Sequence, residues 1–208
     1  TAGIDELDKM GEEDRKSLNE ALEEQTVTIA KANVQVTLKA ETTVLAAANP
    51  KYGRFDIYGD LYKQFELDAT LINRFDLVFP IKDTPDETSN RAIAKLILAR
   101  HRKQQASSEK IDEKLVKKYI AFAKTIEPKV LEDMDQLIVD FFVKTRATAK
   151  IEGGVYSMPI SPRQLNSIIR LAQASARSRL SDKVNEHDVN LAISLITHFL
   201  KQLGMDPE

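Results

Sequence analysis

Two mainly apolar runs most strongly limit what this chain can fold into. They are TTVLAAANP at residues 42–50 and FDLVFPI at residues 75–81, and both lack the regular polar alternation of a half-solvated strand. Such runs are typical of parallel strands that helices bury on both faces. Amphipathic helical patterns flank them at residues 11–25 and 84–101. We therefore predict an α/β fold with a parallel-sheet core for the first half of the chain.

The helix at residues 84–101 carries its own start signal. Thr84 is placed as the N-cap, Pro85 lies in the first turn and Glu87 follows three residues after the cap, which is a capping-box pattern. The apolar spacing predicts a buried face formed by Ile93, Leu96 and Ile97. The polar stretch KQQASSEK that follows, residues 103–110, is typical of a linker or an exposed loop.

After this stretch every segment has a helical pattern. One apolar stripe consists of Leu115, Tyr119, Phe122 and Ile126, and a second of Met134, Leu137, Ile138, Phe141 and Phe142. A third helix begins after Ser161, with Pro162 and Gln164 in a capping box, and turns Leu165, Ile168, Ile169, Ala172 and Ala176 inward. The last runs from about Asn185 to Leu203, where Gly204 is placed to stop it. We therefore expect an α/β part at 1–103, a linker at 104–110 and an all-α subdomain at 111–208.

Composition excludes several classes of protein. Thirty basic residues against 32 acidic ones give a net charge of -2, which argues against a polybasic wrapper of nucleic acid. The absence of cysteine excludes disulfide frameworks and thiolate metal sites. The three histidines have no paired metal-ligand spacing. Without a signal peptide or a run of about 18 apolar residues, we expect a soluble, intracellular protein.

Polar residues follow the short apolar stretch at the chain start and the run at 42–50. Asp5 and Glu6 are adjacent at the end of the first stretch, and Asn49 ends the second. The carboxyl ends of parallel strands form the crevice in which α/β sheets bind ligands. Nucleotide hydrolysis needs one carboxylate near Mg²⁺ and a second to orient or deprotonate the attacking water. Taken alone, however, an acidic loop in water and an Asn-Pro turn are the simpler explanations.

Two arginines are candidates for stabilising phosphoryl charge. Arg74 precedes the run at 75–81, where it could act on a phosphoryl group or pair with Asp76 or a neighbouring carboxylate. Arg163 lies in the first turn of a helix, where the helix dipole disfavours a cation, so a functional reason becomes more attractive.

Between the acidic pair and Asn49 lies a hairpin pattern. TVTIAKANVQVTL, residues 26–38, has two β-rich runs around Lys31-Ala32-Asn33, and Asn33 tolerates the left-handed backbone of a tight turn. The hairpin would present Lys31 at its tip.

The order of these motifs resembles the ATPase region of the minichromosome maintenance (MCM) replicative helicases, members of the AAA+ superfamily. IDELDKM resembles the Walker B segment, EEQTVTIAKANVQVTLKAETTVLAAANP the presensor-1 hairpin and sensor-1 strand, and NRFDLVF the arginine-finger motif. YIAFAKTIEPKV and ISPRQLNSIIRLAQASARSRL resemble the lid with its sensor-2 arginine. The resemblance covers residue 3 to about residue 203. It implies a partial AAA+ (P-loop NTPase-like) core followed by the helical lid.

The resemblance also implies roles for single residues. Asp5 would help to bind Mg²⁺, Glu6 would activate the hydrolytic water and Asn49 would contact the γ-phosphate or the water. Arg74 and Arg163 would reach the ATP of the adjacent subunit in a hexameric ring. Lys31 would face the central channel and grip the phosphate backbone of DNA.

One expected motif is missing: no G-x-x-x-x-G-K-[ST] loop occurs in these 208 residues. We therefore expect the chain by itself to bind and hydrolyse ATP poorly. The alternative to a helicase subunit is a degenerate, non-catalytic MCM-like subunit that binds DNA or partner subunits. A chelatase or loader subunit of the AAA+ superfamily would explain the catalytic motifs but not the hairpin. We expect a cytoplasmic, chromosome-associated archaeal protein, or a nuclear one if the source is eukaryotic.

Overall fold

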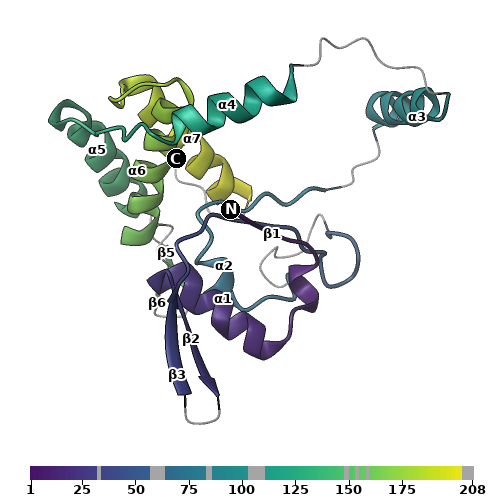
Figure 1. Ribbon diagram of the computed structural model, residues 1–208, viewed down its shortest axis with the longest axis horizontal. Helices are drawn as coiled ribbons and strands as arrows, with labels where there is room; N and C mark the ends of the chain where they lie inside the picture. Colours follow the sequence, from purple (N-terminus) through teal and green to yellow (C-terminus); the bar gives the residue numbers. More distant parts are fainter. Residues whose placement is uncertain are drawn as a thin grey trace.

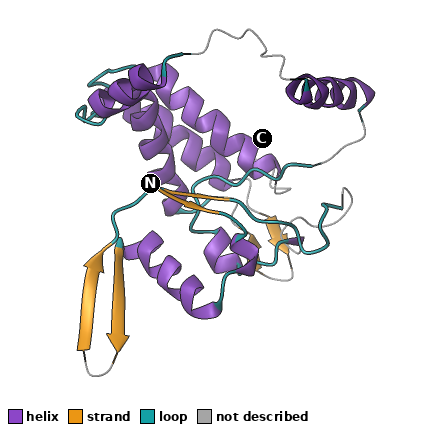
Figure 2. Ribbon diagram, turned by 45° about the vertical axis from the view of Figure 1, so that its right-hand side comes forward, coloured by secondary structure: helices purple, strands orange, loops and turns teal. Residues whose placement is uncertain are grey.

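The computed structural model describes residues 1–31, 34–56, 64–82, 86–102, 111–147, 150–152, 155–157 and 160–202 (Figure 1). The first part consists of short strands and helices from which a hairpin protrudes, and the second part is mainly helical (Figures 1 and 2). The α/β fold class followed by a helical subdomain is therefore confirmed. The predicted linker at 104–110 lies outside the described residues.

A two-stranded parallel sheet lies at the chain start. Strands β1 (Ala2–Ile4) and β4 (Val44–Ala46) pair in parallel, with Ala2 opposite Val44 and Ile4 opposite Ala46. The run at 42–50 thus supplies a parallel strand, as predicted. The prediction that helices bury both faces of this strand is wrong, because Leu45 is 74% exposed and no described helix covers it.

The run at 75–81 forms no strand, contrary to the prediction. A strand needs a neighbour for its backbone hydrogen bonds, and no described segment pairs with this one. Leu77 and Val78 instead pack against the helical core of the second part, whereas Phe79 is 52% exposed. Within the run, Leu77 and Val78 are thus only half-buried, and Phe79 and Ile81 are exposed.

The segment between β1 and β4 contains a helix and a hairpin. After the 3-10 turn η1 (Leu7–Lys9), helix α1 (Glu12–Glu24) leads directly into β2 (Thr26–Lys31), which pairs antiparallel with β3 (Val34–Lys39). The predicted helix and hairpin are confirmed. Lys31 is the last residue of β2 and pairs with Val34. The prediction that Lys31 belongs to the turn is therefore wrong. Ala32 and Asn33 lie outside the described residues.

After the short helix α2 (Ala69–Ile72), helix α3 (Glu87–His101) lies apart from the other helices (Figures 1 and 2). The Asp86 carboxylate accepts a 2.8 Å hydrogen bond from the Ser89 backbone N–H, so Asp86 caps this helix. The predicted cap Thr84 lies outside the described residues. The predicted buried face is wrong, because Ile93, Leu96 and Ile97 are each more than half exposed. The helix packs against no other described element that could cover them.

The helical part contains α4 (Glu113–Ala123), η3 (Glu132–Met134), α5 (Asp135–Ala147), α6 (Pro162–Ser178) and α7 (Glu186–Gln202). It also contains strands β5 (Lys150–Glu152) and β6 (Val155–Ser157), which pair antiparallel. The expectation of helices alone in this half is therefore wrong. The sequence did carry a signal, since Gly153-Gly154 separates two short β-branched or aromatic segments.

The core of the molecule lies mainly between α6 and α7. Ser161 and Gln164 form the predicted capping box of α6, and Ile168, Ala172 and Ala176 are fully buried, as predicted. Val189, Ala192 and Ile196 of α7 belong to the same cluster. The side chain of Asp188 is also buried and binds Arg179, Ser175 and the Asn185 backbone. This core fixes α6, the helix that carries Arg163.

Candidate functional site

The acidic pair and Asn49 lie at the same edge of the parallel sheet. Hydrogen bonds continue past the strand ends, from Ala47 N–H to the Ile4 carbonyl at 2.8 Å and from Leu7 N–H to the Ala47 carbonyl at 2.9 Å. Leu7 is only 2% exposed and anchors this edge in the interior. The structure therefore brings Asp5 and Glu6 beside the segment that leads to Asn49, as expected for the carboxyl ends of parallel strands.

Glu6 has an unusual backbone conformation. Its φ of 54° and ψ of 45° lie in the left-handed region, which few residues other than glycine adopt. The Asp5 carboxylate accepts a 2.9 Å hydrogen bond from the Glu6 N–H, and the Glu6 carboxylate pairs with the Lys9 ammonium at 2.7 Å. The hydrogen bond that Lys9 donates to Glu6, together with the negative charge of Glu6, raises the pKa of the Lys9 ammonium. Both carboxylates remain open to solvent, so they are accessible to a ligand.

Asn49 is held by its backbone rather than by its side chain. Its N–H donates to the Asp8 carboxylate at 2.8 Å, and the residue is exposed. This bond leaves the amide of the side chain available at the sheet edge. Sequence reasoning missed Asp8, although it stands three residues after Asp5 in the same acidic segment.

A magnesium ion fits this edge only with help from a ligand. Within the described residues, no group of three or more His, Cys, Asp or Glu side chains could hold a metal. Mg²⁺ is usually bound through one or two carboxylates together with substrate phosphates and water. The exposed carboxylate of Asp5 provides an oxygen ligand of this kind, so the residues present fit a phosphate-bound magnesium.

Arg74 is held against α1. Its guanidinium donates from Nη1 to the Asn19 carbonyl at 2.5 Å and pairs through Nη2 with the Glu23 carboxylate at 2.5 Å. The side chain is only 17% exposed. Arg74 thus pairs with a carboxylate of its own chain, which was one of the predicted alternatives, but the partner is Glu23 and not Asp76. No sequence signal pointed to Glu23, because the two residues lie far apart in the chain.

Arg163 lies beside Arg74. Its Nη2 donates to the Arg74 carbonyl at 2.6 Å, which gives this cation at a helix N-terminus a structural partner. The Arg163 Nε is buried and has no hydrogen-bond partner in the described part of the chain. The Asp76 carboxylate accepts a 2.5 Å hydrogen bond from the Ser167 hydroxyl and forms an ion pair with Arg170. The segment from Arg74 to Asp76 is therefore attached to α6.

The predicted site residues form two groups. Asp5, Glu6 and Asn49 lie at the sheet edge. Arg74 and Arg163 lie side by side between α1 and α6, because the Arg74 side chain binds α1 and its carbonyl binds Arg163 of α6. Among the described residues, no hydrogen bond or ion pair joins the two groups. Lys31 belongs to neither group, because it ends β2 at the far end of the hairpin.

The hairpin projects from the rest of the chain (Figures 1 and 2). The Thr28 hydroxyl donates to the Glu20 carboxylate at 2.7 Å, which joins the hairpin to α1 and lowers the pKa of the Glu20 carboxyl. Its other face is apolar, and Ile29, Val36 and Leu38 are 50%, 44% and 49% exposed. The Lys31 side chain lies outside the description, but its backbone position is at the hairpin's end.

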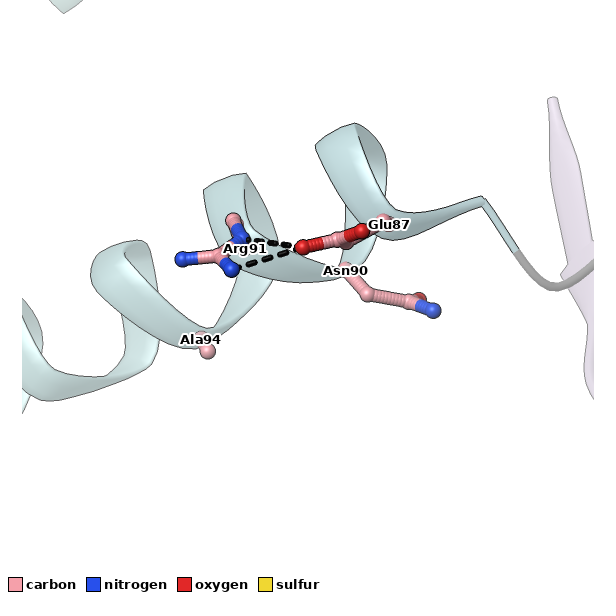
Figure 3. Close-up of a pocket in the computed structure, with 4 residues that line it drawn as sticks. All are labelled: Glu87, Asn90, Arg91 and Ala94. Carbon is pink, nitrogen blue, oxygen red and sulfur yellow. Dashed lines mark hydrogen bonds and ion pairs between the residues drawn. The ribbon is translucent and has the colours of Figure 1, made fainter.

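A depression on the surface of α3 contains none of these residues. Glu87, Asn90, Arg91 and Ala94 line it (Figure 3). The Glu87 carboxylate accepts from Arg91 at 2.9 and 2.6 Å, as is common for exposed residues one helical turn apart. Because the lining comes from a single exposed helix, we assign no function to it.

Comparisons with known proteins agree with this arrangement. A family model described as the MCM P-loop domain matches residues 1–101, and one described as the MCM AAA-lid domain matches residues 114–200. The matches divide the chain between the α/β part and the helical part.

Relatives match the chain along its whole length. The minichromosome maintenance protein MCM of Saccharolobus solfataricus is 40% identical over 208 residues, which are 100% of this chain and 30% of that protein. DNA replication licensing factor MCM4 of Arabidopsis thaliana is 38% identical over 207 residues, 98% of this chain and 24% of that protein. The chain thus spans less than a third of the length of these two relatives. With both family models matched in order, the chain belongs to the minichromosome maintenance family.

Proposed function

We propose that this chain is part of an ATP-driven hexameric DNA helicase that couples hydrolysis at subunit interfaces to DNA translocation and unwinding. The observation that carries the proposal is the parallel pairing of β1 with β4, which places Asp5, Glu6 and Asn49 at one edge. The hairpin is inserted between these two strands. A change at the nucleotide can therefore reach the hairpin through the chain segments that join them.

The acidic edge would act on the nucleotide of its own subunit. Asp5 would hold Mg²⁺, which when bound neutralises charge on the β- and γ-phosphates. Glu6 would orient the attacking water or accept its proton, and its accessible carboxylate suits this role. Asn49 would donate its side-chain amide to the γ-phosphate or the water.

Arg74 and Arg163 would act on the ATP of the adjacent subunit. Their proximity in this chain supports a shared role on one surface. An arginine finger is worth about 10³–10⁵ in rate in other nucleotide hydrolases. Dependence on a neighbour's arginine would limit hydrolysis to assembled rings.

Lys31 would contact DNA in the central channel. The end of a projecting hairpin is a suitable position for an ammonium that grips successive phosphates without reading sequence. A protein with this role would be associated with the chromosome.

We also propose that the boundary between core and lid lies at 104–110, within the stretch that neither family model matches.

The proposal is tested by a strand-displacement assay on the protein in which these residues accompany a phosphate-binding loop. We expect unwinding with ATP and Mg²⁺, and none with a non-hydrolysable ATP analogue. DNA binding without any ATP hydrolysis would support the non-catalytic alternative and contradict a motor.

A further inference from the structure

The guanidinium of Arg74 is held by groups of its own subunit. Nη1 is bound by the Asn19 carbonyl and Nη2 by the Glu23 carboxylate, each at 2.5 Å. Both acceptors belong to α1, and the Arg74 side chain is only 17% exposed. In this position the arginine cannot also present both terminal nitrogens to a phosphate on another subunit.

We propose that Glu23 is a positioning residue that retains Arg74 against α1 until the nucleotide of the neighbouring subunit displaces it. This inference rests on the proposed function, in which Arg74 acts across the interface. Carboxylates and phosphates bind the same planar fork of an arginine, so the two acceptors compete for it. The Glu23 side chain is 54% exposed, which allows the exchange to take place in water.

Glu23 also lies close to the base of the hairpin. Helix α1 ends at Glu24 and β2 begins at Thr26, and the Gln25 carbonyl between them accepts a 2.7 Å hydrogen bond from Ala40 N–H. The release of Arg74 therefore removes a contact from the last turn of α1, next to the hairpin base. In this way the nucleotide on one subunit alters how the adjacent subunit anchors its hairpin.

A purely structural ion pair makes a different prediction. If the pair only stabilised the fold, or if Glu23 aimed Arg74 at the nucleotide, neutralising Glu23 would lower ATP hydrolysis. If Glu23 retains Arg74, the same change raises hydrolysis in the absence of DNA. The sign of the effect therefore separates retention from the other two roles.

The first experiment measures ATP hydrolysis by Glu23→Gln in the assembled protein that contains these residues and a phosphate-binding loop. We expect the DNA-independent kcat to rise about two- to five-fold, the range expected for weakening a partly exposed ion pair. The matched control is Glu24→Gln, the adjacent exposed glutamate, which makes no ion pair within the described residues. A kcat for Glu23→Gln that equals or falls below the wild-type value would overturn the proposal.

The second experiment uses the same assembled protein without nucleotide and does not require ATP hydrolysis. Amide hydrogen exchange is compared among the wild type, Glu23→Gln and Glu24→Gln. We expect faster exchange in the last turn of α1 and the start of β2 for Glu23→Gln only. Equal exchange in both variants would refute retention by Glu23. An assembly that hydrolyses no ATP would instead refute the proposed function, so the two failures are distinguishable.

Discussion

The Ser167 hydroxyl donates to the Asp76 carboxylate at 2.5 Å, which joins the segment after α2 to helix α6. Ser167 is 1% exposed, and Arg170 binds the same carboxylate from the solvent side. Hydrogen bonds to a charged acceptor are stronger than those between neutral groups. The segment that contains Arg74 and Asp76 is thus attached to α1 by the Arg74 side chain and to α6 by the Asp76 side chain.

Replacing Asp76 with Ala should loosen this attachment. The variant loses the bonds to Ser167 and Arg170, while Ser167 keeps its 3.1 Å bond to the Arg163 carbonyl. We expect the free energy of unfolding to fall by about 2 kcal/mol, typical of a hydrogen bond to a charged group. Urea unfolding measures it, with the exposed Asp133→Ala as the control. Equal midpoints for the two variants would contradict the attachment.

Replacing Lys31 with Ala should separate hydrolysis from unwinding. In the proposed helicase assembly, we expect unwinding to be abolished and DNA binding to weaken, because the proposed phosphate contact is lost. ATP hydrolysis should largely survive, because Lys31 lies far along the hairpin from the acidic edge. The control is Lys39→Ala, an exposed lysine at the base of the same hairpin. Full-rate unwinding by the Lys31 variant would argue against a channel role.

Mixing two inactive variants should restore activity if Arg74 acts across an interface. Glu6→Gln removes the proposed water-activating group, and Arg74→Ala removes the proposed finger from the other half of the same site. Some interfaces in a mixed ring would then contain both an intact Glu6 and an intact Arg74. We expect partial recovery of ATP hydrolysis in mixtures, measured against each variant alone. If no mixing ratio restores hydrolysis, the arginine does not act in trans.

Replacing Asp188 with Asn should destabilise the helical core in a pH-dependent way. Burial alone would raise the pKa of the Asp188 carboxyl, but hydrogen bonds from Arg179, the Asn185 backbone and Ser175 hold the pKa below its usual value. A lowered pKa contributes stability above the unfolded-state pKa of about 3.9 and loses it as the pH falls through the folded-state pKa.

We therefore expect Asp188→Asn to lower the free energy of unfolding by about 2–4 kcal/mol at pH 7, as when a buried charge pair is broken. The difference from the wild type should shrink as the pH falls below about 4. Urea unfolding at several pH values measures this, with the exposed Asp182→Asn as the control. A difference that does not change with pH would contradict the assignment.

Local signals predicted the helical core well. The capping box at Ser161 and the spacing of Ile168, Ala172 and Ala176 define both the start and the buried face of α6. These features depend on residues within a few helical turns of one another. The parallel strand in the run at 42–50 was also predictable, because its apolar residues end at a polar Asn-Pro pair.

The errors concern what covers an apolar segment. The run at 75–81 and the face of α3 at Ile93 are apolar, but no described element covers that face and none pairs with the run as a strand. An apolar pattern indicates that burial is favourable, not which surface provides it. The bond between Arg74 and Glu23 was unpredictable for a related reason, since it depends on how α1 packs against the segment after α2.

At position 6 the left-handed backbone favours glycine, whereas the proposed catalytic role requires a carboxylate. A residue with a Cβ is strained by about 1–2 kcal/mol at the observed φ of 54°, whereas glycine is not. Glu6→Gly should therefore relax the backbone, yet it would remove the carboxylate proposed to activate water. If Glu6 has that role, selection for a more stable fold and selection for a faster enzyme favour different residues at position 6.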